Sequence, residues 1–368
     1  MPETNGTRPA PPVTNGRLAA ALLALADAEE PGGRAARDYR AAAAALRQLP
    51  ADLFGRRINI LALPHVTPRA ADALGAFLAC GSDESISDRL TAILDREDPA
   101  RERKRDFLTR ADVDRILSRA ADGAADLADL RADLHLHTDR SDGTLSLADL
   151  HRALRLRGDR YAFLTDHARD CSVAGGLFPA DFAAQARDVA RLNEASDGEL
   201  LMLLGAEANI AEDGTLDVTP RTVPHLAGVV ASIHTDLRSP RDQTARLVRA
   251  VETPGVAVLG HPRGRLYNVR TGVRADWARV FAVAARRGVA VELNGCPERL
   301  DLDPRLARLA NEAGCLFTVS SDAHAHRHLD FQRYALAVAR LAGVPRERVV
   351  NSWSRDRFAA WLEERRAA

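Results

Sequence analysis

From residue 132 to residue 143 the chain reads ADLHLHTDRSDG, an apolar run that ends in histidines and a turn. His135 and His137 are two residues apart, so on a β-strand both imidazoles point to the same side. Asp142 stands in a Ser-Asp-Gly turn beyond them, from which its carboxylate can fold back. The segment therefore predicts a strand whose carboxyl end presents three side chains of metal-ligand type.

Six further apolar runs follow this segment, and helical stretches separate them. The seven candidate strands are Ala132–His137, Tyr161–Thr165, Leu200–Leu204, Leu226–Ile233, Val256–Leu259, Val289–Leu293 and Leu316–Val319. Strands that alternate with helices are typical of a domain built on a parallel sheet. From about Arg131 onward the sequence thus predicts a parallel α/β domain.

Side chains that bind metals recur where these runs end. They are His135 and His137, Asp166 and His167, Glu207, His234, His261, and Asp322 with His324, while Asn294 follows the sixth run. In a barrel of parallel strands the loops after the strands converge at one mouth, where active sites are assembled. One such histidine is more often solvated or hydrogen-bonded than a ligand, but the joint pattern is not expected by chance. The remaining histidines, His65, His151, His225, His326 and His328, are interpreted as surface or helix-start residues.

The chemistry of these side chains indicates which ions they would hold. Imidazole and carboxylate ligands without thiolates suit zinc, manganese or iron better than magnesium alone. One ion needs only about four or five ligands, so the set predicts two or three divalent ions, with Glu207 as a bridge. Such ions lower the pKa of a bound water to roughly 7 and hold phosphoryl oxygens, which favours hydrolysis of a phosphate ester.

Taken together, these motifs resemble the polymerase-and-histidinol-phosphatase (PHP) domain. The resemblance rests on Asp133–His137 with Ser141–Gly143, Thr165–His167, Gly205–Glu207, Ser232–His234, His261–Arg265 and Ser321–His324. Val291–Asn294 and Glu298–Asp301 are similar to the version fused to the C-terminus of bacterial family X DNA polymerases. The similarity extends from about Arg131 to the end of the chain.

This resemblance implies a distorted seven-stranded (β/α)7 barrel with a trinuclear metal site. The implied ligands are His135, His137, Asp142, His167, Glu207, His234, His261, Asp322 and His324. Glu207, Asp322 and Arg265 are the implied catalytic residues. Arg265, with Arg263 and Arg299, would bind the non-bridging phosphate oxygens. For Arg263 and Arg299, an ordinary salt bridge at the rim is an equal alternative.

The first third of the chain has a different pattern. Residues 1–15 are rich in Pro, Thr, Asn and Gly and predict a disordered lead-in. Residues 16–80 predict a small all-α domain that resembles, more weakly, the helical N-terminal domain of the same polymerases. Residues 81–130 predict a helical connector to the PHP domain at 131–368. Gly81-Ser82 and Asp112-Val-Asp114 match a nucleotidyltransferase superficially, but no β-rich palm fits before Asp133, so polymerase activity is not expected.

Residues 63–71 occupy the place of a helix-hairpin-helix turn in this helical domain. In that motif two glycines let backbone N–H groups approach a DNA phosphate. His65 and Thr67 stand at these places, and β-branched threonine disfavours a positive φ. The turn is therefore either a DNA contact or a packing module.

Charge and cysteine content limit the remaining possibilities. The chain has 51 Lys+Arg and 51 Asp+Glu residues, so no overall field attracts nucleic acid or an anionic membrane. A polyanion would need a local basic patch. Cys80, Cys171, Cys296 and Cys315 show no paired spacing, which fits a reducing compartment. With no leader and no membrane-spanning run, a soluble cytoplasmic protein is expected.

Three functions remain in competition. The leading hypothesis is a metal-dependent phosphoesterase that acts on nucleic-acid ends, as a 3′–5′ exonuclease or DNA-repair enzyme. The first alternative is a phosphatase for a small phosphomonoester, of the histidinol-phosphatase type, which the zero net charge mildly favours. The second is a non-catalytic DNA-associated scaffold whose metals only stabilise the barrel, and the complete ligand set argues against it.

Overall fold

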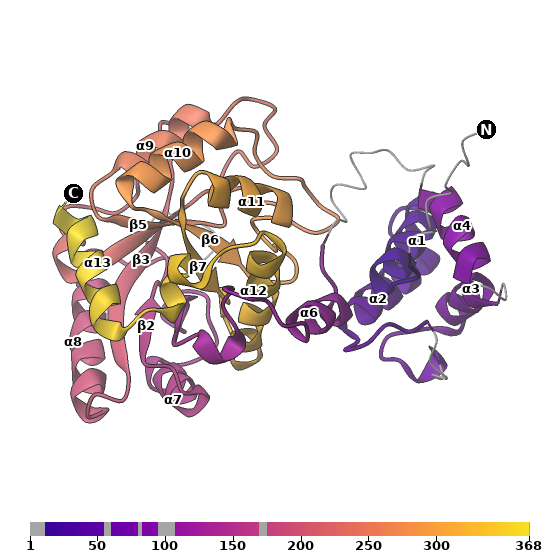
Figure 1. Cartoon of the computed structure of the whole chain (residues 1–368), viewed down its shortest axis with the longest axis horizontal. Coiled ribbons are helices and arrows are strands. Elements are labelled where there is room, and N and C mark those ends of the chain that lie inside the picture. Colours follow the sequence, from indigo (N-terminus) through magenta and orange to yellow (C-terminus); the bar gives the residue numbers. More distant parts are fainter. Residues whose placement is uncertain (1–11, 55–59, 80–82, 95–106, 169–174, 368) are drawn as a thin grey trace. The chain divides into compact units, whose positions relative to one another are not determined.

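The computed structural model describes residues 12–54, 60–79, 83–94, 107–168 and 175–367. Most of the predicted lead-in, together with Cys80, Cys171 and Lys104, lies outside these residues. Contacts between residues divide the chain into two units, Met1–Arg115 and Ile116–Ala368 (Figure 1). Each unit has its own core of buried apolar side chains. No helix among the described residues is long and apolar enough to cross a membrane.

The first unit is built from helices, as the sequence predicts. Its elements are α1 (Asn15–Ala28), α2 (Arg34–Gln48), η1 (Ile60–Ala62), α3 (Pro68–Leu78) and α4 (Asp83–Leu94), and α6 (Arg110–Leu117) crosses into the second unit. Arg17 of α1 donates hydrogen bonds to the hydroxyls of Ser87 (2.8 Å) and Thr91 (2.6 Å). These bonds join α1 to α4, so α4 is part of the same helical unit.

The turn before α3 has an unusual backbone. His65 adopts the left-handed conformation with φ 62°, which glycine would reach without strain. Thr67 instead has φ −81°, and its hydroxyl accepts a hydrogen bond from the backbone N–H of Ala70. Thr67 thus serves as the N-cap of α3, and Pro68 occupies the first turn, where its missing N–H has no cost.

The second unit is a parallel sheet of seven strands in sequential order, which confirms the predicted fold. The strands are β1 (Ala132–Leu136), β2 (Tyr161–Leu164), β3 (Leu201–Asn209), β4 (Gly228–Ser232), β5 (Val256–Gly260), β6 (Ala290–Asn294) and β7 (Leu316–Ser320). The third strand is longer than the predicted Leu200–Leu204, because its ladder with β4 continues from Gly205 to Asn209. Glu207 therefore lies within a strand and not in the loop after it.

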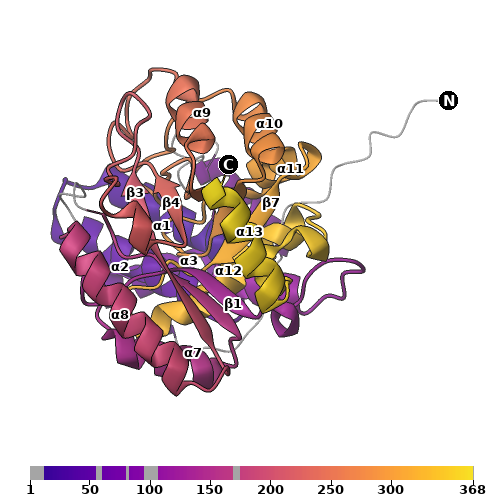
Figure 2. The ribbon, with the colours of Figure 1, turned by 90° about the vertical axis from the view of Figure 1, so that its left-hand side faces the viewer.

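Helices cover the outer side of this sheet (Figures 1 and 2). They are α7 (Leu147–Arg157), α8 (Pro179–Ala195), α9 (Thr244–Glu252), α10 (Trp277–Arg287), α11 (Pro304–Glu312), α12 (Gln332–Leu341) and α13 (Arg355–Ala367), with short 3₁₀ turns between some of them. Phe358 and Trp361 of α13 pack into a core with Ala132 and Tyr161, the first residues of β1 and β2. This apolar packing closes the amino end of the barrel and leaves the carboxyl end for polar side chains.

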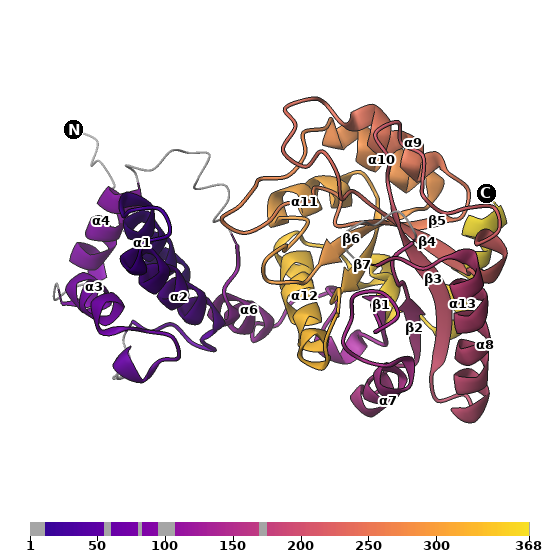
Figure 3. The same ribbon diagram turned by 180° about the vertical axis from the view of Figure 1, so that it is seen from behind.

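The barrel closes where β1 meets β7 (Figure 3). Leu136 and Ala323 form a parallel bridge there, beyond the end of β7. Below it, the buried Asn351 side chain donates to the carbonyls of Ala132 (3.0 Å) and Val319 (2.9 Å) and accepts from the N–H of Val319 (2.7 Å). Gln332 donates to the same two carbonyls at 2.8 and 2.9 Å. Side-chain amides thus replace a backbone ladder along this seam.

Asn351→Leu tests the seam. The substitution keeps the volume but leaves the N–H of Val319 without an acceptor, so we expect the free energy of unfolding to fall by about 2–4 kcal/mol. Denaturant unfolding followed by circular dichroism measures it. Glu363→Leu, at an exposed position of α13, is the control and should change stability little. Equal stability of the two variants would contradict a structural role for the amide.

Candidate metal centre

The carboxyl ends of the strands bring together all nine residues of the expected ligand set. His135 and His137 come from β1 and the residue after it, and Glu207 from β3. His234 and His261 follow β4 and β5, while Asp322 and His324 follow β7. A parallel barrel produces this convergence because every strand ends at the same mouth. Residues nearly 190 positions apart in the sequence therefore share one site.

Glu207 is at the centre of the group. Five imidazoles surround its carboxylate, which is only 1% exposed. Oε2 lies 3.2 Å from Nε2 of His135, 3.5 Å from Nε2 of His137 and 3.2 Å from Nδ1 of His167, while Oε1 lies 2.8 Å from Nε2 of His261 and 3.3 Å from Nε2 of His234. The two oxygens thus face different histidines, as a bridging carboxylate would.

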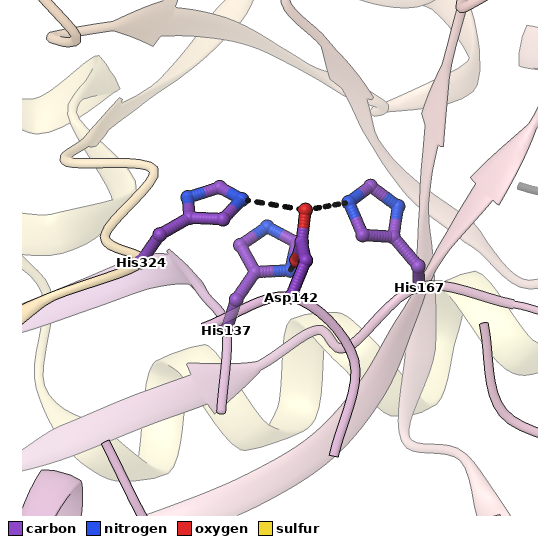
Figure 4. Close-up of side chains that lie close together, drawn as sticks. All are labelled: His137, Asp142, His167 and His324. Atoms are coloured by element: carbon purple, nitrogen blue, oxygen red, sulfur yellow. Dashed lines mark ion pairs between the residues drawn. The ribbon is translucent and has the colours of Figure 1, made fainter. Parts of the chain in front are cut away.

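Two aspartates complete the group. Asp142 lies between three histidines, with Oδ2 at 3.3 Å from Nε2 of His324 and 3.6 Å from Nε2 of His167 (Figure 4). Its Oδ1 lies 3.7 Å from Nδ1 of His137. The second aspartate is Asp322, with Oδ1 at 3.3 Å from Nε2 of His137. The carboxylate of Asp142 therefore folds back toward the histidines of the strand, as the sequence predicts.

The donor atoms suit divalent ions. Three groups of ligand atoms lie within 4.8 Å of one another: His137, Asp142, His167 and His324; His135, His137 and Glu207; and His167, Glu207 and His234. In the described structure, Nε2 of His135 and both ring nitrogens of His137 are buried with no hydrogen-bond partner of good geometry. Buried polar atoms normally have partners, so these nitrogens fit lone pairs that point at ions.

The charges of the carboxylates and imidazoles in this group shift one another's pKa values. Burial opposes ionisation of Glu207, but the surrounding imidazoles hold its pKa well below the ordinary value. Burial also lowers the pKa of His324, yet Asp142 and Asp322 raise it to about 9. Burial and the neighbouring His324 lower the pKa of His137 to about 4. Protons and metal ions would compete for the same nitrogens, since only deprotonated imidazole binds a metal.

Comparisons with known proteins agree with this geometry. The chain is 32% identical over 239 residues to the DNA polymerase/3′-5′ exonuclease PolX of Bacillus subtilis, which covers 65% of this chain and 42% of the relative. It is 31% identical over 178 residues to a protein named probable phosphatase from Caldanaerobacter subterraneus, covering 45% of this chain and 66% of the relative. The chain is a PHP-domain protein.

Further comparisons are more distant. The chain spans less than half the length of the polymerase relative. A histidinol phosphate phosphatase structure from Lactococcus lactis, with zinc, L-histidinol and phosphate bound, shares 14% identity at a TM-score of 0.41. That alignment covers 56% of this chain and 92% of the other. No family model matches the chain.

A second layer of polar residues supports the PHP ligands, and its central member is not among the site residues predicted from the sequence. Glu292 of β6 is fully buried, with Oε1 at 2.7 Å from Nδ1 of His135. Its Oε2 accepts a 2.6 Å hydrogen bond from the backbone N–H of His261. Asn294 donates to Glu292 (3.2 Å) and to Asp322 (3.0 Å). The signal was present in the sequence, because a glutamate within a buried apolar strand requires a polar partner.

Asp166 holds the other side of the site, although the sequence placed it among the strand-end ligand types. Its carboxylate accepts hydrogen bonds from the N–H and hydroxyl of Thr138 (2.7 and 2.6 Å) and from the hydroxyl of Ser141 (2.6 Å). Gln185 donates to it as well, at 2.5 Å. These bonds fix the loop that carries Asp142, so Asp166 orients a metal ligand through its neighbours in that loop.

The three predicted phosphate-binding arginines are placed differently from one another. Nη1 of Arg263 lies 2.6 Å from Oδ2 of Asp303, which is the salt-bridge alternative for this residue. Arg265 is buried against the same aspartate, at 3.7 Å. Nε of Arg299 lies 3.3 Å from Oδ2 of Asp322, so this arginine contacts an expected ligand directly. Arg299 is the arginine of this set placed best to meet a phosphate.

Two of the other histidines differ from the surface or helix-start interpretation. His151 is buried within α7, so that interpretation was wrong for this residue. Nδ1 of His328 accepts a hydrogen bond from the backbone N–H of His324 at 3.3 Å. The ring of His328 also stacks on Phe331, 4.7 Å between centroids. His328 therefore supports the loop of a ligand without joining the group.

Asp142→Ala should reduce the number of bound ions. The residue contacts three histidines of one four-ligand group, so its loss should remove about one ion per chain and spare those held around Glu207. Elemental analysis after zinc or manganese loading and desalting measures the content, with two or three ions expected for the wild type. Asp139→Ala is the control, because Asp139 lies in the same loop and is exposed. A wild-type chain with no bound metal would contradict the ligand set.

Proposed function

We propose that the PHP domain hydrolyses phosphate esters with two or three divalent ions bound by the nine ligands, and that its substrate is the 3′ end of a nucleic acid strand. The observation that carries the first part is Glu207, a buried carboxylate within 3.5 Å of nitrogens from five histidines. When bound, such ions lower the pKa of water to roughly 7 and polarise phosphoryl oxygens.

The chain's own residues divide the work. His137, His167 and Glu207 each belong to two of the three ligand groups, so these residues lie where the groups adjoin and would hold the ions there. Glu292 fixes the ring of His135, and hydrogen bonding at Nδ1 directs Nε2 toward the centre. The side chain of Arg299 is a quarter exposed, and it offers its guanidinium to a phosphate that enters the mouth. Orientation and charge are thus in place before the substrate binds.

The nucleic-acid part rests on similarity and organisation. The relative named a DNA polymerase/3′-5′ exonuclease aligns over 239 residues, whereas the relative named a probable phosphatase aligns over 178. The helical unit that precedes the barrel also resembles a polymerase domain, and a metabolite phosphatase has no need of it. A DNA-repair role in the cytoplasm follows from this proposal.

The second candidate is a phosphatase for a small phosphomonoester. Its support is the series of relatives named probable phosphatases and the zero net charge of the chain. The two candidates share the metal centre and differ in what lies beside the scissile phosphate. Separate assays of an oligonucleotide and a small phosphate ester therefore distinguish the two candidates.

Glu207→Gln should remove activity while preserving the barrel. The change keeps the shape but removes the charge shared by the histidines, so we expect kcat/KM to fall about a hundredfold or more. The measurement uses a 5′-labelled oligonucleotide and p-nitrophenyl phosphate, with folding followed by circular dichroism. Cleavage of the oligonucleotide should fall steeply with added salt, because phosphate contacts release counterions. Hydrolysis of only the small ester would favour the phosphatase, and a parallel loss of fold would favour the scaffold.

The N-terminal unit should not act as a lyase through imine chemistry. Such a lyase needs a lysine amine as nucleophile, and the first 103 residues contain no lysine. Borohydride treatment of the full-length protein with abasic DNA should therefore trap no covalent adduct within this region. An adduct mapped there by peptide mass spectrometry would refute the prediction. Template-directed nucleotide addition should be undetectable as well.

A further inference from the structure

Arginines gather on the loops that follow β4, β5 and β6, beside the metal centre. They include Arg238, Arg263, Arg265, Arg270 and Arg299. Arg263 and Arg265 lie against Asp303, and the backbone N–H groups of both face Asp301. The two aspartates are therefore already engaged. What the remaining arginines bind is a separate question.

Arg270 is held in a defined position. It ends a tight turn in which Leu266 and Arg270 exchange two backbone hydrogen bonds of 3.0 Å. Its Nε donates to the carbonyl of Gly264 at 2.7 Å. The backbone N–H of Tyr267 donates to the carbonyl of Glu298 at 2.7 Å, which ties this turn to the loop that carries Arg299. Within the described parts of the chain, the two terminal nitrogens of Arg270 have no partner and remain for a ligand.

The charges around Arg270 are unfavourable in the absence of an anion. The loop that carries Arg238 packs against the turn of Arg270, because a Cβ built on Gly264 would clash with the side chain of Leu237. Burial lowers the pKa of Arg270, and the positive charges of Arg299 and Arg238 lower it further, while Asp301 opposes them. Among the residues that the structure describes, neither Arg270 nor Arg238 forms an ion pair. Like charges that are held together without a counterion repel one another, so an anion shared between them would relieve the repulsion.

We infer that Arg270 and Arg238 form a second phosphate subsite next to the metal centre, which binds the phosphodiester on the 5′ side of the scissile linkage. The inference rests on the proposed function, since the scissile phosphate must occupy the metal centre beside Arg299. At a 3′ end, the only neighbouring phosphate is on the 5′ side. A small phosphomonoester has no second phosphate, so this subsite selects a nucleic acid strand over a metabolite.

Arg270→Gln and Arg238→Ala in the full-length, metal-loaded protein test the subsite. Each should lower the ratio of oligonucleotide kcat/KM to p-nitrophenyl phosphate kcat/KM by roughly five- to tenfold, through KM. The salt dependence of oligonucleotide cleavage should become shallower by about 0.7 in log–log slope. Arg238 is exposed, so its variant keeps the test valid if Arg270→Gln fails to fold. Arg152→Ala, an exposed arginine of α7 paired with Asp149, should change neither activity.

A neutral linkage identifies the phosphate concerned. A methylphosphonate at the second linkage from the 3′ end should raise the wild-type KM about as much as Arg270→Gln does, and should add little in that variant. Additive effects, or an unchanged ratio in both arginine variants, would overturn the subsite while leaving the phosphoesterase in place. If the wild type cleaves neither substrate, the proposed function fails. Fluorescence anisotropy of the labelled oligonucleotide then decides the subsite, because equal binding by wild type and variants would exclude it.

Discussion

A single buried carboxylate organises this protein. Glu207 is almost inaccessible to solvent, and burial of an uncompensated carboxylate is costly in free energy. The chain meets that constraint with five imidazoles, each supplied by a different strand end or by β1. The imidazoles in turn need acceptors for their N–H groups, or ions for their lone pairs. Asp142 and Asp322 lie at the same mouth and face three of these rings. The barrel provides the one place where all of these side chains can meet.

The second polar layer gives this centre its rigidity. Glu292 connects His135 with the backbone at His261, and Asn294 connects Glu292 with Asp322. Ligands from β1, β5 and β7 are thereby joined through two residues of β6. Asp166 does the same for the loop that carries Asp142. Such fully hydrogen-bonded networks in a low-dielectric interior fix ring orientation and tautomer, and ligand geometry then depends little on side-chain fluctuation.

The balance of charge is local and not global. Lys+Arg and Asp+Glu are equal in number over the chain, but arginines lie close to the carboxylates of the mouth, as the pairs Arg263–Asp303 and Arg299–Asp322 show. Arg263 and Arg265 are neutralised by aspartates of a neighbouring loop, whereas Arg299 bridges the two regions through Asp322. A net charge near zero therefore does not exclude a polyanionic substrate, because binding depends on the field at the site.

The sequence alone predicted seven strands in a parallel domain with metal-binding side chain types at the strand ends, and its resemblance to the PHP domain implied the nine ligands. The strand predictions depend on local rules: apolar runs of strand length, the two-residue alternation of His135 and His137, and the position of polar residues after each run. The sequence alone did not predict that Glu207 lies within a strand, because that strand is longer than its apolar run. It also did not indicate the role of Glu292, because this residue lies within a run and not at its end. Only the tertiary structure decided that Glu292 orients His135, that Asn351 and Gln332 close the seam, and which arginines are already paired. Those pairings join residues tens to hundreds of positions apart, and their partners are set by the curvature of the barrel, which no local pattern encodes.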